Sequence, residues 1–306
     1  MIVSTREFYE KAFHAEYAIG GFQAYNMEMV QGILEVCAEE RSPALVQSSC
    51  RGVRYAGAET LYHIARIHSE KLGIPAALHL DHGDSLTLCR QVIDAGFLSV
   101  MLDNTGLPFE QQAEKTRMLV QYAHNRGAVV EGEIAMPADC PERWMTLPAD
   151  AKAFVEYTQC DSLSVCVGNS HALYGRGFPD TDTPHIRMRL LESIHTALPN
   201  TPLILHSINA LQPPSLKQRF EDAGGKNRQY NVLCGEELHQ AMRLGVVKCN
   251  IGIDKLAMTV GIREYLRDHP AEMDPRKYLA NGKSVMKEAI RQQMRDLFKS
   301  CNQLDI

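Results

Sequence analysis

The sequence lacks the features that place a protein in a membrane or on a secretory route. None of the apolar runs in its 306 residues approaches the roughly 18–20 residues that a membrane-spanning helix requires. The segment Met1–Glu7 leads directly into an amphipathic pattern and contains no apolar signal-peptide core. We therefore expect a cytoplasmic protein that does not bind a membrane.

A surplus of positive charge is missing as well. The chain has 32 lysines and arginines against 37 aspartates and glutamates, a net charge of −5, and the two signs are interspersed. Without a basic stripe or a polybasic segment, the surface is a poor match for nucleic acid or for anionic lipid. The expected partner is therefore a small molecule.

Paired cysteine motifs are absent too. The nine cysteines are scattered, odd in number and without a Cys-x-x-Cys pair. This pattern is typical of reduced thiols and argues against a disulfide framework or a structural zinc cluster. Cys166 and Cys249 fall inside predicted strands, where cysteine acts as a small buried apolar residue. We assign the cysteines no chemical role.

What the sequence does contain is a regular alternation of strand-like and helix-like segments. Eight short runs rich in Val, Ile, Leu and Ala are typical of strands buried on both faces. The predicted strands are Ala18–Phe22, Ala44–Ser48, Ala76–Leu80, Ser99–Asp103, Ala128–Glu133, Asp161–Val167, Leu203–His206 and Val246–Ile251. The predicted helices are Met27–Glu40, Glu59–Lys71, Leu86–Ala95, Phe109–Arg126, Ala151–Tyr157, His185–Ala197 and Glu236–Arg243. The alternation predicts an α/β fold, a closed (β/α)8 TIM barrel formed by residues 1–306 as a single domain.

The tail from Asp274 onward has apolar residues at helical spacing and predicts a C-terminal helical extension. We expect it to pack outside the barrel or across a subunit boundary. Two connections, 136–149 and 207–235, are longer than a barrel needs. Long loops on the carboxyl face of a barrel usually form lids or substrate walls.

Three histidines, His82, His171 and His206, end or follow predicted strands three, six and seven. Strand carboxyl ends point into the mouth of a parallel barrel, so the three imidazoles are expected to converge there. One histidine at a strand end is more often structural, but three in one mouth favour a divalent metal. Neutral imidazoles suit Zn²⁺, with Co²⁺ or Fe²⁺ as substitutes, and three protein ligands leave a position open for water or substrate.

Carboxylates flank the expected metal. In an extended strand Asp81 points away from His82, which favours a general acid–base role over a fourth ligand; a salt bridge at the barrel rim is the alternative. Glu131 and Glu133 share one face of the fifth strand. Glu133, nearer the carboxyl end, is expected to bind the metal or to orient a ligand, and Glu131 to lie one layer deeper in a structural role.

Other polar residues also end strands. Asp103 and Asn104 are candidates for orienting a ligand histidine or a substrate hydroxyl, and Asn250 either binds a substrate hydroxyl or stabilises a turn. A metal held by three histidines beside a carboxylate supports two chemistries. It activates water for hydrolysis, or it polarises a ketone so that an adjacent carbanion becomes an enediolate. The pattern does not choose between them.

Eight segments spread over the chain carry a family resemblance. They are Tyr17–Phe22, Asn26–Val30, Ser42–Gln47, His79–Gly83, Leu107–Glu110, Val130–Glu133, Gly245–Ile251 and Asp274–Leu279. Through them the chain resembles the class II, zinc-dependent ketose-bisphosphate aldolases, a family that includes the fructose-bisphosphate aldolases, over essentially its whole length. The resemblance implies that His82, His171 and His206 hold Zn²⁺, one ion per chain.

The resemblance also implies roles around the metal. Asp81 carries the proton of the C4 hydroxyl during carbon–carbon cleavage, and Glu133 matches a glutamate that steadies the metal or offers it an alternative position. Asn250 matches an asparagine near the donor's hydroxyls, and Ser49 matches a serine at the acceptor end. Gln23 stands where the family has an asparagine.

Arg276 falls in a region that the family associates with the far phosphate and with subunit contacts. Because family members are dimers or tetramers, the resemblance implies a homodimer or homotetramer. A monovalent cation is a further candidate cofactor.

The chain departs from the family where the family binds phosphate. The family follows its third ligand with a turn rich in glycine and serine, whose amides reach a phosphate because no side chains intervene. Here Ser207-Ile208-Asn209 takes its place. The family's Asn-x-Asp-Thr-Asp after strand eight becomes Asn-Ile-Gly-Ile-Asp in Asn250–Asp254, and a lysine after the second ligand is absent, although Arg176 is close by.

The family's glycine-rich lid after strand five, which carries a proton-transferring glutamate, is replaced as well. Asp139 and Glu142 are the candidates for this role here, and neither aligns cleanly. A phosphate dianion needs several donors at close range, and one charge pair at about 4 Å is worth about 4 kcal/mol at an effective dielectric of about 20. The combined losses predict a changed donor: an unphosphorylated ketone, or an anion held differently, with Arg176 as a candidate.

Three hypotheses follow from the sequence. The first is a metal-dependent aldolase with a changed donor. The second is an ordinary fructose- or tagatose-bisphosphate aldolase whose phosphate contacts have been rebuilt. The third is a zinc-binding homologue that does not catalyse, which the intact ligands and Asp81 disfavour. A metallohydrolase is disfavoured by the full-length resemblance.

Overall fold

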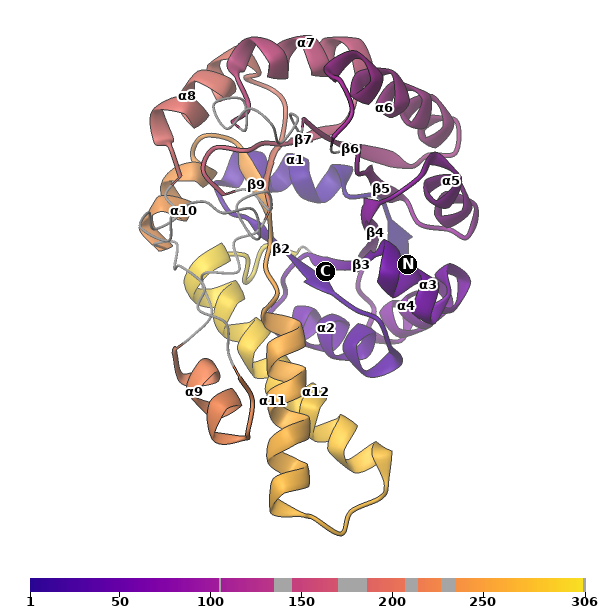
Figure 1. Cartoon of the computed structure of the whole chain (residues 1–306), viewed down its shortest axis with the longest axis vertical. Helices are drawn as coiled ribbons and strands as arrows, with labels where there is room; N and C mark the ends of the chain where they lie inside the picture. Colours follow the sequence, from indigo (N-terminus) through magenta and orange to yellow (C-terminus); the bar gives the residue numbers. More distant parts are fainter. Residues whose placement is uncertain (105, 135–144, 170–185, 207–213, 227–234, 305–306) are drawn as a thin grey trace.

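The computed structural model describes residues 1–104, 106–134, 145–169, 186–206, 214–226 and 235–304. Eight of its strands form a closed parallel barrel (Figure 1). They are β2 (Ile19–Gln23), β3 (Ala44–Ser49), β4 (Ala76–Gly83), β5 (Ser99–Leu102), β6 (Val129–Glu133), β7 (Ser162–Ser164), β8 (Leu203–Leu205) and β9 (Val246–Asn250). Pairing between β4 and β5 joins the two ends of the strand order, which confirms the predicted TIM barrel.

Nearly all residues of the barrel strands are buried, including polar residues that face the barrel interior. Every residue of β2 and β9 is buried, because the barrel interior lies on one side and helices cover the other. Parallel pairing places Gln47 beside His79 and Ser49 beside Asp81. Inward-facing polar residues therefore form layers across neighbouring strands, as side chains do in TIM barrels.

Helices surround the barrel (Figure 1). They are α1 (Arg6–Ala15), α2 (Met27–Glu39), α3 (Cys50–Ala56), α4 (Ala58–Leu72), α5 (Leu86–Asp94), α6 (Phe109–His124), α7 (Pro148–Thr158), α8 (Met188–Ala197), α9 (Pro214–Asp222), α10 (Gly235–Met242), α11 (Ile253–Asp268) and α12 (Pro275–Gln292). Side chains of Asn26, Ser85 and Asp274 accept backbone N–H groups at the starts of α2, α5 and α12. None of the helices among the described residues is both long and apolar enough to cross a membrane.

The sequence patterns miss five elements: the short strand β1 (Ile2–Val3), which pairs with β4, and helices α1, α3, α9 and α11. Helix α9 lies inside the connection predicted as a loop, 207–235. Helix α11 packs against α12, α9 and β2. Its buried face includes Asp254 and Gly261, and Leu266 is exposed, so its apolar residues do not follow the stripe by which a surface helix is recognised. Strands β7 and β8 end earlier than predicted.

Helices α11 and α12 form a hairpin that projects from the barrel (Figure 1). Helix α12 returns along α2, where Lys287 pairs with Glu35 at 3.0 Å and with Glu39 at 2.7 Å, and Arg291 pairs with Glu40 at 2.9 Å. This arrangement confirms the predicted C-terminal helical extension. The extension packs outside the barrel over most of its length.

The chain then turns back to the barrel through a π-helix, η4 (Gln293–Phe298). Phe298 is fully buried against Phe22, with ring centroids 6.2 Å apart, and its carbonyl accepts a hydrogen bond from the Ala18 N–H at 3.0 Å. Ala18 precedes β2, so η4 covers the amino-terminal end of the barrel. The opposite end, where the strand carboxyl ends lie, is left for the site.

We expect Phe298→Ala to lower the free energy of unfolding by about 3–5 kcal/mol, because it removes a fully buried ring and leaves a cavity. Ile67→Ala is the control, since Ile67 of α4 is 57% exposed; it should change the free energy of unfolding by less than about 0.5 kcal/mol. Urea denaturation followed by circular dichroism measures both. Equal stability of the two variants would show that η4 does not close the barrel.

Candidate active site

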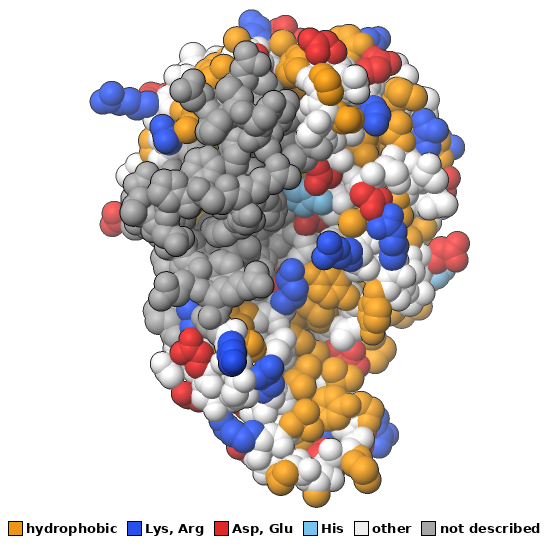
Figure 2. All heavy atoms as spheres, viewed as in Figure 1, with side chains coloured by type: hydrophobic (Ala, Val, Ile, Leu, Met, Phe, Trp, Pro, Cys, Tyr) orange, Lys and Arg blue, Asp and Glu red, His pale blue; other side chains and the backbone are white. Residues whose placement is uncertain are grey.

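Polar side chains gather at the carboxyl ends of the barrel strands. Asp81 and His82 lie near the end of β4, Glu133 ends β6, Asn250 ends β9, and His206 follows β8. Figure 2 shows this face of the molecule, where histidine and acidic side chains lie next to one another near the centre. The barrel topology therefore brings together residues that are far apart in the sequence.

Asp81 is fixed by two amide side chains. Gln23 Nε2 donates to Asp81 Oδ2 at 2.5 Å, and Asn250 Nδ2 donates to Asp81 Oδ1 at 2.8 Å. Burial raises the pKa of Asp81, but the electrostatic effect of the neighbouring His82 and His206 outweighs it and holds that pKa well below its usual range. The group is thus an oriented carboxylate, the form that accepts a proton.

Gln23 also links Asp81 to β3. Its Oε1 accepts the backbone N–H of Ser49 at 3.1 Å, so one side chain spans two neighbouring strand ends. Room for these amides depends on Gly21, since a Cβ there would lie 2.6 Å from Asn250 Oδ1 and 2.5 Å from Gln47 Oε1. Gly21 therefore permits the close packing that holds the carboxylate.

His82 faces the same site as Asp81, which corrects the expectation that the two point to opposite sides of an extended strand. The pairing of β4 with β5 shifts register between Leu80 and Gly83, and His82 has a φ of 52°, in the left-handed region. Irregularities of this kind turn a side chain and are common at functional sites. As a result His82 Nε2 lies 3.8 Å from Asp81 Oδ1.

The orientation of His82 is set by Asp103, whose Oδ2 lies 3.2 Å from His82 Nδ1. Burial lowers the pKa of His82, but the Asp81 carboxylate and the Asp103 hydrogen bond outweigh it and raise that pKa to about 10. The carboxylates of Asp81 and Asp103 thus stabilise the positively charged form of the His82 imidazole. Metal binding requires the neutral imidazole, so an ion would replace its proton.

His206 is oriented from below by Glu131, whose Oε1 lies 2.7 Å from His206 Nε2. On its other side His206 Nδ1 lies 3.6 Å from Glu133 Oε1. The His82 and His206 rings meet edge to face, with centroids 4.8 Å apart. Burial raises the pKa of Glu133, against the opposing effect of the two histidines.

The donor set fits a divalent metal. Ligand atoms of Asp81, His82 and His206 lie within 4.8 Å of one another, and so do those of His82, Asp103 and Glu133. Imidazole and carboxylate are the usual ligands of zinc and related metals, and each histidine here has its other nitrogen fixed by a carboxylate, as ligand histidines usually do. The second set contains Glu133, the residue expected to bind the metal or to orient one of its ligands.

A second polar layer lies beneath the first; the sequence predicted Glu131 in this deeper position, but His79 and Lys248 were missed. Glu131, His79 and Lys248 are each within 2% of complete burial. Burial and Lys248 lower the pKa of His79 to about 3, whereas burial raises the pKa of Glu131 and Lys248 brings it well below its usual range. The period of two along a strand could have indicated this layer, because His79, Glu131 and Lys248 precede Asp81, Glu133 and Asn250, respectively, by two positions.

Of the other predicted site residues, Asp254 adjoins the cluster through Gln23, whereas Arg276 lies on the projecting hairpin. Asp254 is fully buried at the start of α11, where it accepts the backbone N–H groups of Gln23 and, at 2.7 Å, Lys255. Arg276 lies in the first turn of α12, at the tip of the hairpin (Figure 1), and pairs with Asp274 at 2.8 Å. Six predicted residues lie outside the described residues: His171, Arg176, Ser207, Asn209, Asp139 and Glu142.

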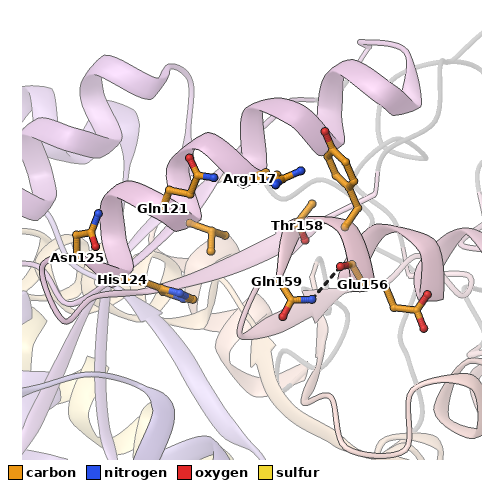
Figure 3. A pocket seen from close by; sticks show the side chains of 9 residues that line it. Arg117, Gln121, His124, Asn125, Glu156, Thr158 and Gln159 are labelled. Atoms are coloured by element: carbon orange, nitrogen blue, oxygen red, sulfur yellow. Dashed lines mark hydrogen bonds between the residues drawn. The ribbon is translucent and has the colours of Figure 1, made fainter.

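A separate groove of about 600 Å³ lies between α6 and α7 (Figure 3). Arg117, Gln121 and His124 of α6 line it, together with Glu156 and Gln159 at the end of α7. These residues belong to the outer helical layer rather than to the strand ends. The groove is therefore distinct from the cluster around Asp81.

Comparison with known proteins gives consistent matches over the whole chain. The model of the family described as fructose-bisphosphate aldolase class-II matches residues 3–303. A protein named fructose-bisphosphate aldolase from Treponema pallidum (strain Nichols) is 34% identical over 310 residues, covering 94% of this chain and 93% of that protein. A protein of the same name from Thermus caldophilus is 35% identical and covers 98% of this chain and 99% of its own.

Solved structures of similar fold agree with these matches. The YdjI aldolase from Escherichia coli K12 superposes with a TM-score of 0.78 at 23% identity, covering all of both chains. The fructose-bisphosphate aldolase (Fba) from Campylobacter jejuni has a TM-score of 0.78 at 18% identity, covering 99% of this chain and 97% of that one. At sequence identities of 23% and 18%, this structural similarity supports the fold and nothing further.

The buried Asp254 predicts a pH dependence of stability. Burial raises its pKa to about 7 from a usual 3.8, so the folded protein keeps a proton that the unfolded chain has released. Stability should therefore fall as the pH rises from about 4 to about 7, by up to about 1.4 kcal/mol per pH unit from this group.

The Asp254→Asn variant cannot ionise at this position but still accepts a hydrogen bond, so it should lose this part of the slope. Urea denaturation across the same pH range measures it. Asp268→Asn, an exposed change on the same helix, should leave the slope as in the unaltered protein. An identical slope in the Asp254→Asn variant would contradict the assignment.

Proposed function

Because the chain belongs to the class II fructose-bisphosphate aldolase family, a family of carbon–carbon lyases, we propose that it is a metal-dependent aldolase whose ketose donor differs from fructose 1,6-bisphosphate. The observation that carries the reaction type is the oriented Asp81 carboxylate beside two histidines. Gln23 and Asn250 hold this carboxylate, and Nε2 of His82 lies 3.8 Å from it. We further propose one domain over residues 1–306 and a cytoplasmic location.

We assign the metal, preferably Zn²⁺ with Co²⁺ or Fe²⁺ as substitutes, to His82, His206 and His171. Asp103 contacts Nδ1 of His82, so we assign Nε2 of His82 to the metal. Glu131 contacts Nε2 of His206, so we assign Nδ1 of His206 to the metal. When bound, the ion supplies Lewis-acid polarisation of the donor's carbonyl and stabilises the negative charge that develops there. Glu133 is proposed to steady the ion or to offer it the alternative position with His82 and Asp103.

Asp81 is proposed as the acid–base group. In cleavage its carboxylate accepts the proton of the C4 hydroxyl while the C3–C4 bond breaks, the aldehyde leaves, and the bonding electrons move into the donor's C2 carbonyl. A proton is then added at C3 of the donor, for which Asp139 and Glu142 are the candidates. In condensation the same steps run in reverse, so Asp81 returns its proton to the new C4 oxygen.

The ends of the substrate are assigned by position. Ser49, next to Asp81 in the strand register, is proposed to line the acceptor end, and Asn250 to reach the donor's hydroxyls. At the donor end, Ile253 stands where the family has a threonine, and it is 1% exposed and without a polar side chain. Asp254 already uses two backbone N–H groups beside it. These features support a donor other than the standard phosphorylated ketose, with Arg176, Ser207 and Asn209 as further contacts.

An ordinary fructose- or tagatose-bisphosphate aldolase with rebuilt phosphate contacts is the second candidate. The relatives at 34% and 35% identity carry the name fructose-bisphosphate aldolase, which favours it.

A homodimer or homotetramer is the proposed assembly. The hairpin of α11 and α12 carries exposed apolar side chains, Leu266 at 37% and Met273 at 89%, near Arg276. Exposed apolar groups on a projecting element are typical of subunit contacts.

Metal removal and donor choice are tested in one assay. We expect retro-aldol cleavage to require the metal, because the metal is proposed to stabilise the charge that develops on the donor's carbonyl. EDTA should abolish cleavage, and added Zn²⁺ should restore it. Fructose 1,6-bisphosphate, fructose 1-phosphate and free fructose are compared on zinc-loaded protein. Strong EDTA-sensitive cleavage of the bisphosphate would reject the changed donor and favour the second candidate.

Asp81→Asn should lower kcat by about 10²–10⁴-fold, because an amide cannot accept the C4 proton. Zinc content per chain should stay that of the unaltered protein. Asp84→Asn is the matched control, since Asp84 lies three positions further on, pairs with Arg54 at 2.6 Å and has a side chain that is 41% exposed. Measured kcat and metal analysis of both variants decide the matter. Equal losses in the two variants, or loss of zinc with Asp81→Asn, would refute the acid–base role.

A further inference from the structure

A buried ion pair lies directly beneath the cluster of Asp81, His82 and His206. Lys248 Nζ donates to Glu131 Oε2 at 2.7 Å, and the two side chains are 0% and 1% exposed. Taking both charges out of water costs free energy that mutual attraction offsets only when the geometry is good and the remaining lone pairs are satisfied. Lysine is among the residues least often buried, so a lysine at this position needs a reason beyond packing.

The Glu131 carboxylate lies between two histidines as well as the lysine. Its Oε1 is 2.7 Å from His206 Nε2, whereas its Oε2 is 3.5 Å from His79 Nε2. Lys248 Nζ donates to the same Oε2 at 2.7 Å, closer than His79 Nε2. Glu131 therefore makes a hydrogen bond with His206 and only a long contact with His79.

His79 is in a position to compete for this carboxylate. Its Nδ1 lies 2.8 Å from Ser99 Oγ, which in turn is 3.2 Å from Thr5 Oγ1. Within the described part of the chain, its Nε2 is buried and has no hydrogen-bond partner. Without the lysine, a small rotation of the Glu131 carboxylate toward His79 would satisfy that nitrogen at the expense of His206.

We propose that Lys248 is a positioning residue that holds the Glu131 carboxylate toward His206 and thereby fixes the His206 tautomer used for metal binding. A carboxylate only accepts hydrogen bonds, so the proton of His206 resides on Nε2 and the lone pair on Nδ1. Nδ1 is the atom that the proposed function assigns to the metal, and the role of Lys248 rests on that assignment. Lys248 acts through Glu131 and touches neither metal nor substrate.

The position of Lys248 on β9 gives this role a second consequence. Lys248 and Asn250 are two residues apart on one strand, so both face the interior, one layer above the other. Asn250 holds Asp81 and Lys248 holds the partner of His206. Strand β9 thus sets the orientation of the proposed base and of a proposed metal ligand together.

The test compares zinc affinity in Lys248→Met, in the double variant Lys248→Met/Glu131→Gln, and in Lys287→Met as the control. Methionine keeps the length of the lysine chain without its charge. In the double variant, the glutamine carbonyl still accepts from His206 Nε2, and its amide can donate to His79 Nε2, so both histidines are served without a buried charge. Lys287 is also in an ion pair, with Glu35 at 3.0 Å, but on the outer helices.

Zinc affinity is measured by competition with a chromogenic chelator, and the coordination of His206 by the visible absorption of the Co²⁺ form. We expect Lys248→Met to weaken zinc binding by about 10- to 100-fold and to alter the Co²⁺ spectrum. The double variant should recover most of the loss, and Lys287→Met should stay within about twofold of the unaltered protein. Recovery in the double variant separates positioning from packing, because a packing role predicts a further loss.

Wild-type zinc affinity and an unchanged Co²⁺ spectrum in Lys248→Met would overturn the proposal, and so would a double variant no better than the single one. If Lys248→Met does not fold, the double variant decides alone: folding with zinc bound supports the proposal, and failure to bind overturns it. A wild-type protein that binds no zinc would instead overturn the proposed function itself, which distinguishes the two failures.

Discussion

Closure of the parallel barrel is the constraint on which the site depends. Once β4 pairs with β5, every second residue of eight strands faces one interior that excludes water, and each polar group there must find its partner on another strand. The carboxylate of Asp81 is accordingly held from β2 and β9, and that of Glu131 from β9 and the end of β8. The cross-strand hydrogen bonds that satisfy the buried polar groups are also the ones that orient the reactive groups.

The charges of this interior explain why a cation suits it. Asp81, Glu131 and Glu133 lie close together, and Lys248 is the fully buried lysine among the described residues that faces them. Against the lowering effect of burial, the negative charge of Asp81, together with the Asp103 hydrogen bond, raises the pKa of His82, whereas burial is the main cause of the raised pKa of Glu133. Protons on these groups relieve the repulsion, and a divalent ion shared by the histidines would relieve it further.

The barrel and the residues at its strand ends could be predicted from the sequence, because hydrophobic runs and a period of two report burial and facing directly. The common orientation of Asp81 and His82 could not, since it depends on a register shift between β4 and β5 and on a left-handed φ at His82. In the sequence, Lys248 is simply a polar residue within a mostly apolar predicted strand. Its depth, and its choice of Glu131 as partner, follow only from how β6 and β9 face each other across the barrel.

Gln23 shows why specificity and reactivity are hard to separate in this site. Its backbone N–H is bonded to Asp254, its Nε2 to Asp81 and its Oε1 to the backbone of Ser49. One residue therefore connects the proposed donor end, the proposed base and the proposed acceptor end. A change at the start of α11 that moved Asp254 would also move Gln23, and with it one of the two hydrogen bonds that orient Asp81. Because Asp254 is fully buried and Ile253 beside it is 1% exposed, a substitution at either position would press on β2 and disturb the hydrogen bonds that orient Asp81.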